Sequence, residues 1–418
     1  MMSQAFYTGI NGIKAHQYGI DVISDNLANI NTVGFRGYTT EFSSLFEEAL
    51  VTSSDFSSAS SGVGIGTKLN TVAMNESSGV FQLSDRSTDL AILGDGWFGI
   101  QAEGEPVYTR DGAFLFDENR DLVTNDGYYV LGTMGDNITD GVLTQQLAEV
   151  ELGDVDAQQK LQFPEELLFS VQPTTEASFY GNLTAGDETR VISSGIIDAQ
   201  NNKNNLRLEF AKSVPQVSPG AQWDIVATVE NLEGTEVYST SSGVASFDDA
   251  GALISSTLTS IDNNGTDVAI NLGTGYDGLM AMGDEFSGSS SANGLEAGDL
   301  LGYDINKNGE VIATFSNGMQ SAVGMVAVYH FQNDRGLERV SGSRFAESQN
   351  SGRAIFFQDE NGKNITGTDM TNFKLEGSNV DMTAGLTEII IMQRSYDANS
   401  KSITAADEML QKALGMDA

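Results

Sequence analysis

Three glycines, Gly94, Gly96 and Gly99, have the G-x-G-x-x-G spacing of a turn that binds the pyrophosphate of a dinucleotide. That chemistry needs a helix directly after the glycines, and a carboxylate about 20 residues further on. The residues that follow are WFGIQ and a second short apolar run, which indicate a strand and a hairpin instead. We therefore interpret the glycines as a tight turn between strands, and we expect no cofactor.

Two segments resemble the start of a calcium-binding loop, in which oxygen-bearing side chains alternate before a glycine. They are DINKNG, residues 304–309, and DENRD, residues 117–121. The twelfth position of such a loop should be a bidentate Glu, but Phe315 and Tyr128 stand there. We interpret both segments as turns stabilised by Asp and Asn side chains, and we expect no metal site.

Candidate catalytic groups are few. The chain has no Cys, which excludes thiolate nucleophiles and disulfides, and only two histidines, His16 and His330. Asp111 beside Arg110 could supply an acid and a base, but acidic residues at this density are mostly solvated and no spacing singles out a pair. His330 lies in the alternating run VAVYHFQN, where a structural role is the simpler interpretation. We expect no catalytic residues and no enzyme.

The charge of the chain restricts its partners. The 418 residues include 21 Lys and Arg against 58 Asp and Glu, a formal net charge of −37. Nucleic acid is excluded, because a phosphate backbone must be neutralised by Lys and Arg. No apolar run reaches the roughly 18 residues that cross a bilayer, so we expect no membrane insertion. The start of the chain lacks the basic and apolar regions of a secretory signal, which indicates export by another route, if any.

Apolar residues at both ends of the chain repeat at helical intervals of three, four and seven. They predict one helix of about 30 residues before Gly34 and Gly37, and a second long helix from Gly385, with Asn399 as a polar member of its apolar face. We interpret both faces as an assembly seam in a coiled-coil-like domain, and two helices packed on an ordinary core are the alternative. The assembly seam comprises Phe6, Ile10, Ile13, Ile20, Ile23, Leu27, Ile389, Met392, Tyr396, Ile403 and Leu410.

Between the helices, short apolar runs separated by Asp-Gly and Asn-Asp-Gly turns predict antiparallel strands. The fold class is therefore mainly β with terminal α-helices. Residues 1–70 and 375–418 are expected to form the helical assembly domain, with a Ser-rich linker, and 71–145 and 301–374 a discontinuous β domain. Residues 146–300 hold 24 acidic against 5 basic residues and predict an inserted acidic β-sandwich or barrel that lies outermost.

The two ends and the first β region resemble the flagellar hook and rod family of axial proteins. In SDNLANINTVGFRG, residues 24–37, the segment Asn26, Leu27, Ala28, Asn29 and the turn Gly34, Phe35, Arg36 are similar to its N-terminal signature. STDLAILGDGWFGI and the run from VYTRDG to YYVLG resemble its first β domain. LEGSNVDMTAGLTEIIIMQRSYDANSKSITAADEMLQKAL, residues 375–414, resembles its C-terminal signature. The resemblance covers about half of the chain. Residues 146–300 match the family only in their place in the chain and in their general sequence pattern.

This resemblance implies a structural subunit that polymerises with itself into a curved tube, the hook, a universal joint that transmits torque from rod to filament. It implies contacts with distal rod, hook cap and hook–filament junction proteins and with the flagellar export apparatus, and a place in the extracellular hook after export without a cleaved signal peptide. The large insertion and the GLERV return favour a hook subunit over a distal rod protein. A secreted β-rich adhesin with a helical stalk, whose ends would not pair, is a rival from another class, and a glycan-cleaving enzyme is a third.

Two physical expectations follow for the parts of the molecule. An isolated amphipathic helix leaves its apolar face in water, so we expect the terminal helices to be poorly ordered in a free subunit and to find partners only between copies. The acidic insertion should limit adhesive contacts between outer domains. Deleting residues 146–300 should then leave polymerisation intact and alter bending.

Overall fold

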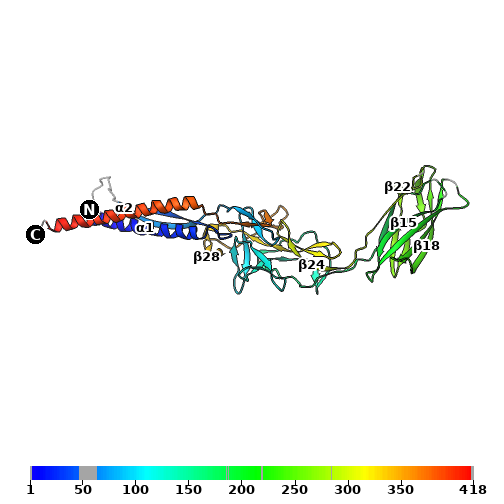
Figure 1. Cartoon of the computed structure of the whole chain (residues 1–418), viewed down its shortest axis with the longest axis horizontal. Coiled ribbons are helices and arrows are strands. Elements are labelled where there is room, and N and C mark those ends of the chain that lie inside the picture. The colour runs from blue at the N-terminus through cyan, green and yellow to red at the C-terminus, as the bar shows by residue number, and fades with distance from the viewer. Residues whose placement is uncertain are drawn as a thin grey trace.

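The computed structural model describes residues 2–46, 64–184, 186, 188–217, 220–283 and 285–415. The molecule is long and narrow, with a helical rod, a middle β part and an outer β part in a row (Figure 1). Both ends of the chain lie at the free end of the rod, and the outer part lies at the opposite end (Figure 1). The described residues are mainly β with an α-helix at each end, which confirms the predicted fold class.

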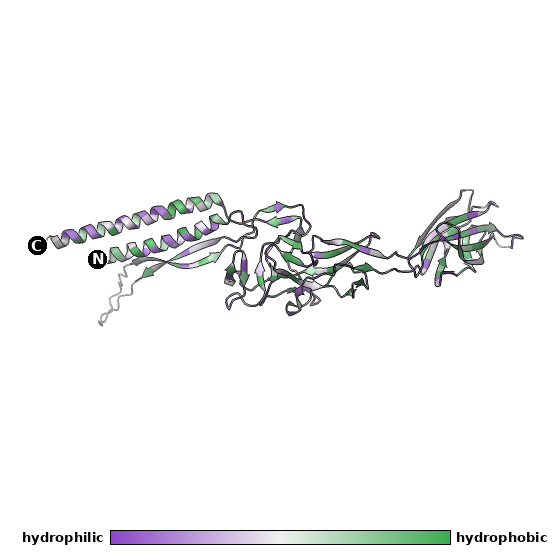
Figure 2. Ribbon diagram, turned by 60° about the horizontal axis from the view of Figure 1, so that its bottom comes forward, coloured by the Kyte–Doolittle hydropathy of each residue, from purple (hydrophilic) through white to green (hydrophobic). Residues whose placement is uncertain are grey.

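Two helices form the rod, α1 (Met2–Ala28) and α2 (Met382–Gly415). They lie side by side and run in opposite directions (Figures 1 and 2). α2 begins three residues before the predicted Gly385, because the Asp381 side chain caps it by accepting hydrogen bonds from the backbone N–H groups of Thr383 and Ala384. Neither helix is long and apolar enough to cross a bilayer, which holds for every helix of the described residues.

A two-stranded ribbon of β1 (Tyr38–Phe46) and β2 (Gly64–Met74) runs along α1, on the side away from α2 (Figure 2). The Phe42 ring of β1 lies 5.9 Å from the His16 ring of α1. The predicted Ser-rich linker covers residues 41–66, but residues 41–46 are part of β1 and residues 64–66 are part of β2. The rest of that predicted linker, residues 47–63, lies outside the described residues.

The middle part is built on a 15-stranded sheet that combines early and late segments of the chain. β26 pairs with β9, so residues near 325 complete a sheet begun near 130. In sheet order, its strands are β10 (Ile138–Thr139), β11 (Val142–Leu143), β13 (Leu168–Phe169), β24 (Gly298–Ile305), β25 (Glu310–Phe315), β26 (Gln320–Val326), β9 (Tyr129–Met134), β5 (Trp97–Gln101), β6 (Val107–Thr109), β29 (Arg344–Ala346) and β28 (Glu338–Ser341), with β12 (Gln159–Lys160) and β8 (Leu122–Thr124) on β9, β27 (Val328–Tyr329) on β5, and β7 (Phe114–Phe116) on β8.

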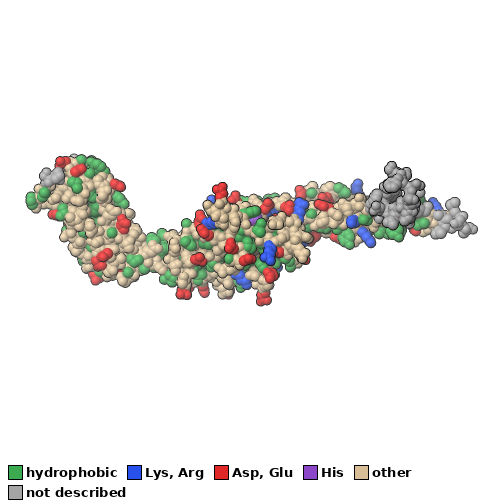
Figure 3. Space-filling view, turned by 180° about the vertical axis from the view of Figure 1, so that it is seen from behind, with side chains coloured by type: hydrophobic (Ala, Val, Ile, Leu, Met, Phe, Trp, Pro, Cys, Tyr) green, Lys and Arg blue, Asp and Glu red, His purple; other side chains and the backbone are tan. Residues whose placement is uncertain are grey.

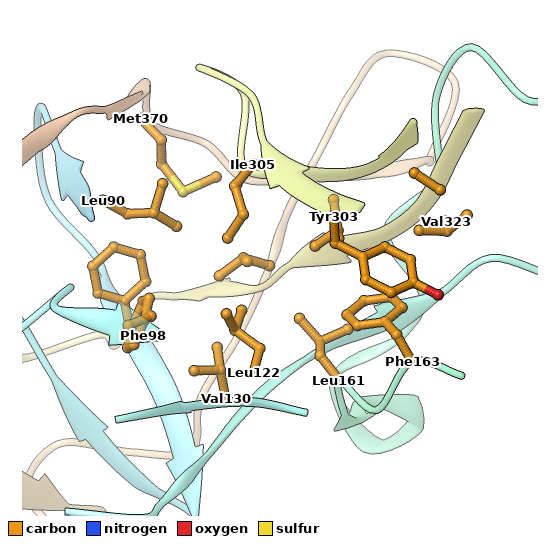
Figure 4. Packing of buried hydrophobic residues seen from close by; sticks show 14 of the residues in the cluster. Leu90, Phe98, Leu122, Val130, Leu161, Phe163, Tyr303, Ile305, Val323 and Met370 are labelled. Carbon is orange, nitrogen blue, oxygen red and sulfur yellow. The ribbon is translucent and has the colours of Figure 1, made fainter. Parts of the chain in front are cut away.

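Three short pairs complete the middle part: β3 (Phe81–Leu83) with β33 (Lys374–Glu376), β4 (Leu90–Ile92) with β32 (Met370–Asn372), and β30 (Phe357–Gln358) with β31 (Asn364–Ile365). Two 3-10 turns, Val155–Ala157 and Asp334–Gly336, connect strands. The core draws on distant segments, since Leu90, Leu161, Tyr303 and Met370 converge in it (Figure 4).

The outer part is a ten-stranded sheet with its own core. Along β17, Trp223, Ile225, Ala227 and Val229 are buried and alternate with more exposed residues, the period of a strand with one face in a core. β15 lies next to β23, so the sheet curls around this core. In sheet order, its strands are β15 (Arg190–Ile197), β16 (Lys203–Lys212), β17 (Gln222–Asn231), β18 (Val237–Phe247), β19 (Ala252–Ser256), β22 (Gly273–Met280), β14 (Glu176–Asn182), β21 (Thr266–Asn271) and β20 (Ser260–Asn263), with β23 (Ser287–Ala292) on β14.

The outer sheet is shorter than the predicted insertion of residues 146–300. Its strands span 176–292, whereas β12, β13 and β24 pair within the middle sheet. Leu161, Phe163 and Phe169 also belong to the middle core. The composition of the chain changes near 146, but strand pairing, which composition does not report, sets the boundary. Deleting 146–300 would therefore remove part of the middle core, so that expectation does not hold for this deletion.

Candidate assembly site

The two helices meet along a stripe of small residues on α1. Gly9, Gly12, Ala15 and Gly19 are buried at intervals of three and four. A Cβ atom added to Gly12 would lie 2.6 Å from the Asn399 side-chain nitrogen, and one added to Gly9 would lie 2.7 Å from a carbon of the Ile403 side chain. The glycines therefore let α2 approach the α1 backbone closely. The prediction relied on large apolar residues and missed this stripe, although the spacing of the glycines could have indicated it.

The structure brings only some residues of the assembly seam together. Ile23 and Leu27 of α1 lie near Gly385 of α2, and the Met392 sulfur lies 3.3 Å from the His16 Nδ1 atom. Ile403 and the half-buried Met392 face the glycines of α1. The remaining seam residues lie at the margin of the contact: Ile10, Ile13, Ile20 and Ile389 are half-buried, and Phe6, Tyr396 and Leu410 are exposed.

One expectation about these helices was wrong. We expected the two ends to find partners only between copies, but α1 and α2 pack against each other within a single chain. The physical reason is the glycine stripe, which turns one face of α1 into a groove for α2. The pairing also counts against the adhesin, for which we expected no contact between the ends. The use of the seam between copies stays a prediction.

Three charged side chains from distant segments meet where the rod joins the middle part. Arg36 follows α1, Arg110 follows β6, and Glu376 ends β33. Glu376 lies between the two arginines, with its Oε1 atom 3.0 Å from Arg36 Nη2 and its Oε2 atom 3.7 Å from Arg110 Nη1. The three side chains are 2–3% exposed. This buried triad joins the N-terminal, middle and C-terminal segments at one point.

Backbone groups tighten the same junction. The Gly34 N–H donates to the Glu376 carbonyl at 2.7 Å, and the Gly79 N–H donates to Glu376 Oε1 at 2.9 Å. Gly34 has φ +65°, and a Cβ atom there would lie 2.4 Å from the backbone nitrogen of Asp111. Only glycine fits such a close approach with this backbone conformation.

Two asparagines clamp the segments on either side of the triad. Asn26 exchanges two hydrogen bonds with the backbone of Tyr38, at 2.6 and 2.8 Å. Asn379 accepts from the Gly37 N–H at 2.7 Å and donates to the carbonyls of Asn75 and Ser77. An amide side chain can donate and accept at once, so each asparagine ties together segments that are distant in the sequence.

The predicted family-motif residues fall into two groups. Asn26, Gly34 and Arg36 make the junction contacts just described, and Phe35 is buried beneath the guanidinium of Arg339, 5.3 Å from its ring centroid. The other three, Leu27, Ala28 and Asn29, lie at the end of α1: Leu27 faces Gly385, Ala28 is exposed, and Asn29 donates to the Asp25 carbonyl. Sequence reasoning found this motif but not its partners Arg110, Glu376 and Asn379.

Burial shapes the charge of the junction. It lowers the pKa of Arg36, and burial together with the neighbouring Arg36 charge lowers the pKa of Arg110 to about 10. The Glu376 carboxylate opposes both shifts, followed by Asp95 and Asp334. Both arginines therefore stay charged at neutral pH, and removing Glu376 would leave two buried cations without their main counter-charge.

The two segments that resemble calcium loops are turns, as interpreted. Asp117 Oδ1 accepts from the N–H groups two and four residues later, at 2.9 Å each, and Asn306 Oδ1 does the same at 2.9 and 3.0 Å. Asp198, Asp248 and Asp359 close three more hairpins in the same way. These oxygens accept hydrogen bonds from backbone N–H groups. Among the described residues, no group of three or more His, Asp or Glu is arranged to hold a metal ion.

The remaining candidate residues also have structural surroundings. Gly94 and Gly96, which has φ +128°, lie in the turn between β4 and β5, whereas Gly99 lies within β5 itself. His330 is buried and its Nε2 atom lies 2.6 Å from the Thr366 carbonyl, and burial lowers its pKa. Asp111 accepts from the Ala113 N–H, and burial raises its pKa.

Comparison with known families matches the segments that form the rod and the middle part. Residues 6–36 match the model for the flagella basal body rod protein, and 91–167 match the D1 domain model of the flagellar hook protein FlgE/F/G. Residues 373–416 match the C-terminal model of the flagellar basal body rod FlgEFG protein. Together with paired terminal helices around a discontinuous β part, these matches define the class: an axial structural protein of the bacterial flagellum.

Relatives narrow this class. The chain is 30% identical to the flagellar hook protein FlgE of Brucella suis over 420 residues, 96% of each chain, and 26% identical to that of Escherichia coli over 99% of this chain and 100% of the relative. The crystal structure of Helicobacter pylori flagellar hook protein FlgE2 shares the fold, with a TM-score of 0.53 and 16% identity over 71% of this chain and 100% of that one. The chain belongs to the flagellar hook protein family.

The family sets the function at its broadest level. The protein is a structural subunit of the flagellar hook, and it belongs with the proteins of the hook and basal body. The family is structural, and nothing in the described residues is positive evidence of catalysis.

Proposed function

We propose that this hook subunit polymerises with itself into a curved tube through apolar side chains that the helix pair leaves exposed. Met382, Leu386 and Ile390 follow each other at intervals of four residues on α2 and are 46–52% exposed. They lie outside the face of α2 that packs on α1, which includes Met392, Asn399 and Ile403. We call these three residues the exposed stripe, and it is the single observation that carries the proposal. A continuous apolar stripe on a surface helix is typical of a contact with another molecule.

Burial of the exposed stripe by neighbouring copies would contribute enough free energy to stabilise a polymer. Full burial of such a side chain contributes about 1.5–3 kcal/mol, so covering the exposed half contributes about 1 kcal/mol each. Ile391 and Met409 of α2 are similarly exposed. One copy gains little from a single contact, but each copy in a tube meets several neighbours, so the contributions add.

The shape of the subunit supports a layered tube. The rod, the middle part and the outer part lie in a row (Figure 1), so helices packed side by side would form an inner layer, with the β parts further out. Contacts that join copies head to tail without closing generate a helical filament. In such a tube the inner layer would transmit torque from rod to filament while the outer parts change their spacing as the tube bends.

The same proposal covers partners and location. We place the subunit in the extracellular hook after export through the flagellar secretion channel. Its partners there would be distal rod, hook cap and hook–filament junction proteins. Membership of the hook family supports this placement, as does the match of both ends of the chain to models named for basal body rod proteins.

A polymerisation experiment tests the proposal. Purified full-length chain should form curved tubes visible by negative-stain microscopy and should sediment above a critical concentration. Ile390→Asp places a charge in the exposed stripe and should raise that concentration at least tenfold, whereas Ile390→Leu should leave it within twofold. Circular dichroism should show the same helix content for both monomers, because Ile390 is exposed and lies outside the α1 contact. Wild-type chain that stays monomeric, or Ile390→Asp chain that assembles normally, would contradict the proposal.

A further inference from the structure

A hairpin of the middle part reaches the base of the rod. It consists of β28 and β29, and Figure 1 places β28 beside the end of α1, where the rod meets the middle part. All four residues of β28 are exposed, and β28 is the last strand of the 15-stranded sheet. The base of the hairpin is firm, because Phe345 of β29 is buried and its ring lies 4.8 Å from the ring of Trp97. The hairpin is therefore a fixed arm of the middle part.

Arg339 of β28 makes a direct contact with α1. Its Nη1 atom lies 2.8 Å from Asp25 Oδ2, and the two side chains are 31% and 48% exposed. The Arg339 Nε–H group donates to the Gly342 carbonyl at 2.8 Å, so the turn of the hairpin holds the guanidinium in the orientation that meets α1. One guanidinium thus joins a strand of the middle part to a helix of the rod.

The same guanidinium lies over two aromatic rings. Its central carbon lies 5.3 Å from the centroid of the Phe35 ring and 5.7 Å from that of the Tyr38 ring. Phe35 lies in the segment after α1, and Tyr38 begins β1. An aromatic ring attracts a cation that lies within about 6 Å of its centroid. Arg339 therefore contacts the helix, the turn after it and the ribbon.

A second arginine of the same segment also binds the rod side of the junction. The Nη2 atom of Arg335, in the second 3-10 turn, lies 3.3 Å from Glu76 Oε2, and both side chains are about half exposed. Glu76 follows β2 of the ribbon. Residues 335–339 therefore hold the rod at two places, one on α1 and one just beyond the end of the ribbon.

The buried triad holds the rod at a different place. Arg36 and Glu376 lie in the segments that connect the helices to the middle part, outside both helices. A connection at one such point keeps two bodies together but leaves the angle between them free to change. Asp25 lies on α1 itself, so a contact there resists tilting of the helix.

We propose that Arg339 is a positioning residue, and that the β28–β29 hairpin is a latch that fixes the angle between the rod and the middle part by holding Asp25. The latch lies within one chain, so it goes beyond the proposed self-assembly and does not rest on it. Exposed ion pairs are weak, whereas a buried ion pair is costly to break. The latch therefore opens before the triad breaks, and the rod then tilts about the triad without separating from the middle part.

Distances between two spin labels test the latch in dilute full-length monomers. The chain has no Cys, so Ser400→Cys on α2 and Glu103→Cys in the middle part supply two labelling sites, both exposed. Asp25→Lys places a cation opposite Arg339 and should at least double the width of the distance distribution. Asp21→Lys makes the same change one helical turn earlier, at an exposed position of α1, and should leave the width unchanged.

A charge swap tests whether Arg339 is the partner that matters. Arg339→Glu alone should widen the distribution as Asp25→Lys does, and the two changes together should restore the narrow distribution of the wild type. Arg339→Ala opens the latch in a second way, and Arg353→Ala, which removes another exposed Arg of the middle part, is its control. Unfolding followed by Trp97 in a Trp223→Phe background should be nearly the same for Asp25→Lys and its control, because an exposed ion pair contributes little to stability.

Two results would overturn the latch. One is an equal width for Asp25→Lys and Asp21→Lys. The other is a widened distribution that stays wide when Arg339→Glu is combined with Asp25→Lys, because the angle would then depend on Asp25 through another partner. Neither measurement depends on polymerisation, so the latch and the proposed self-assembly fail separately.

Discussion

The middle part is joined to its two neighbours in opposite ways. Towards the rod, a buried triad, two asparagine clamps and a glycine without room for a Cβ atom hold the chain segments together. Towards the outer part, only two linkers cross, residues 170–175 and 293–297, joined to each other by paired backbone bonds between Gln172 and Leu295. The first junction should move as one body with the rod, and the second should allow a change of orientation at small cost.

The outer junction is held mainly by exposed polar contacts. Lys203 of the outer sheet lies 2.7 Å from Glu296 in the linker, and both side chains are about half exposed. Asn317 of the middle part donates to the Glu296 carbonyl at 2.7 Å, and Asn201 accepts from the Ala297 N–H. The outer part shows carboxylates and apolar side chains on the face in Figure 3, whereas the visible Lys and Arg side chains lie on the other two parts. Exposed polar contacts of this kind contribute about 0–1 kcal/mol each.

The largest expected effect comes from removing the carboxylate of the triad. Glu376→Ala leaves Arg36 and Arg110 buried without their main counter-charge, which should lower the free energy of unfolding of the rod and middle part by about 3–5 kcal/mol. Trp97 lies in the middle part and Trp223 in the outer part, and the chain has no other Trp. In a Trp223→Phe background only Trp97 reports on unfolding, and denaturant titration should show the loss of stability. In a Trp97→Phe background only Trp223 reports, and the unfolding transition of the outer part should not change.

Glu388→Ala is the matched control for that experiment, since it removes an exposed carboxylate from α2. It should leave both transitions in place. If Glu376→Ala shifted the transitions of Trp97 and Trp223 equally, the two junctions would couple their parts equally. That result would contradict the difference between the two junctions.

A second test concerns the close approach at Gly34. Gly34→Ala forces Ala into an unfavourable backbone conformation, which costs about 1–2 kcal/mol. It also overpacks the side chain against Asp111, which costs about 1–3 kcal/mol. The free energy of unfolding of the middle part should therefore fall by about 2–5 kcal/mol. Gly104 has φ +98° but nothing within 4 Å of an added Cβ atom, so Gly104→Ala should show the backbone cost alone. The Trp97 transition measures both variants, and equal costs would remove the steric argument for the junction.

The dependence of stability on pH gives a smaller test near the same junction. Burial lowers the pKa of His330 below its usual value near 6.5, so the unfolded chain takes up the proton first as pH falls. The stabilisation by neutral His330 is complete above about pH 7.5 and should decrease as the pH falls through about 6.5, the pKa of His in the unfolded chain. His330→Gln cannot titrate, so the stability difference between wild type and variant should shrink over this range. A stability difference that stays constant or grows as the pH falls would contradict a lowered pKa of His330.

The smallest effect on stability, and the clearest effect on shape, is expected at the outer junction. Lys203→Ala removes an exposed ion pair and should change either unfolding transition by less than about 1 kcal/mol. The spread of distances between spin labels on the middle and outer parts should widen, and Asn317→Ala should act in the same direction. Lys212→Ala, which removes another Lys of the outer sheet, is the control. Unchanged distance distributions would mean that other contacts fix the orientation.

Patterns within a short stretch of sequence determined much of this protein. The intervals between Ile13, Ile20 and Leu27 predicted α1, because burial on one face of a helix imposes its period on the residues. The Asp and Asn residues of the supposed calcium loops predicted turns, because their side chains bond to backbone groups only two to four residues away. The signature around Gly34 and Arg36 predicted the family before any partner of these residues was known.

Tertiary structure alone decided how those pieces meet. Gly37 and Asn379 are 342 residues apart when they bond, and nothing in the sequence around either one specifies the other. Composition placed the start of the insertion near residue 146, whereas strand pairing placed it near 176. The glycines of α1 proved to be the floor of a groove for α2. Local sequence fixes local conformation through short-range bonds and periodic burial, but packing between distant segments depends on shape and charge that exist only once the chain is folded.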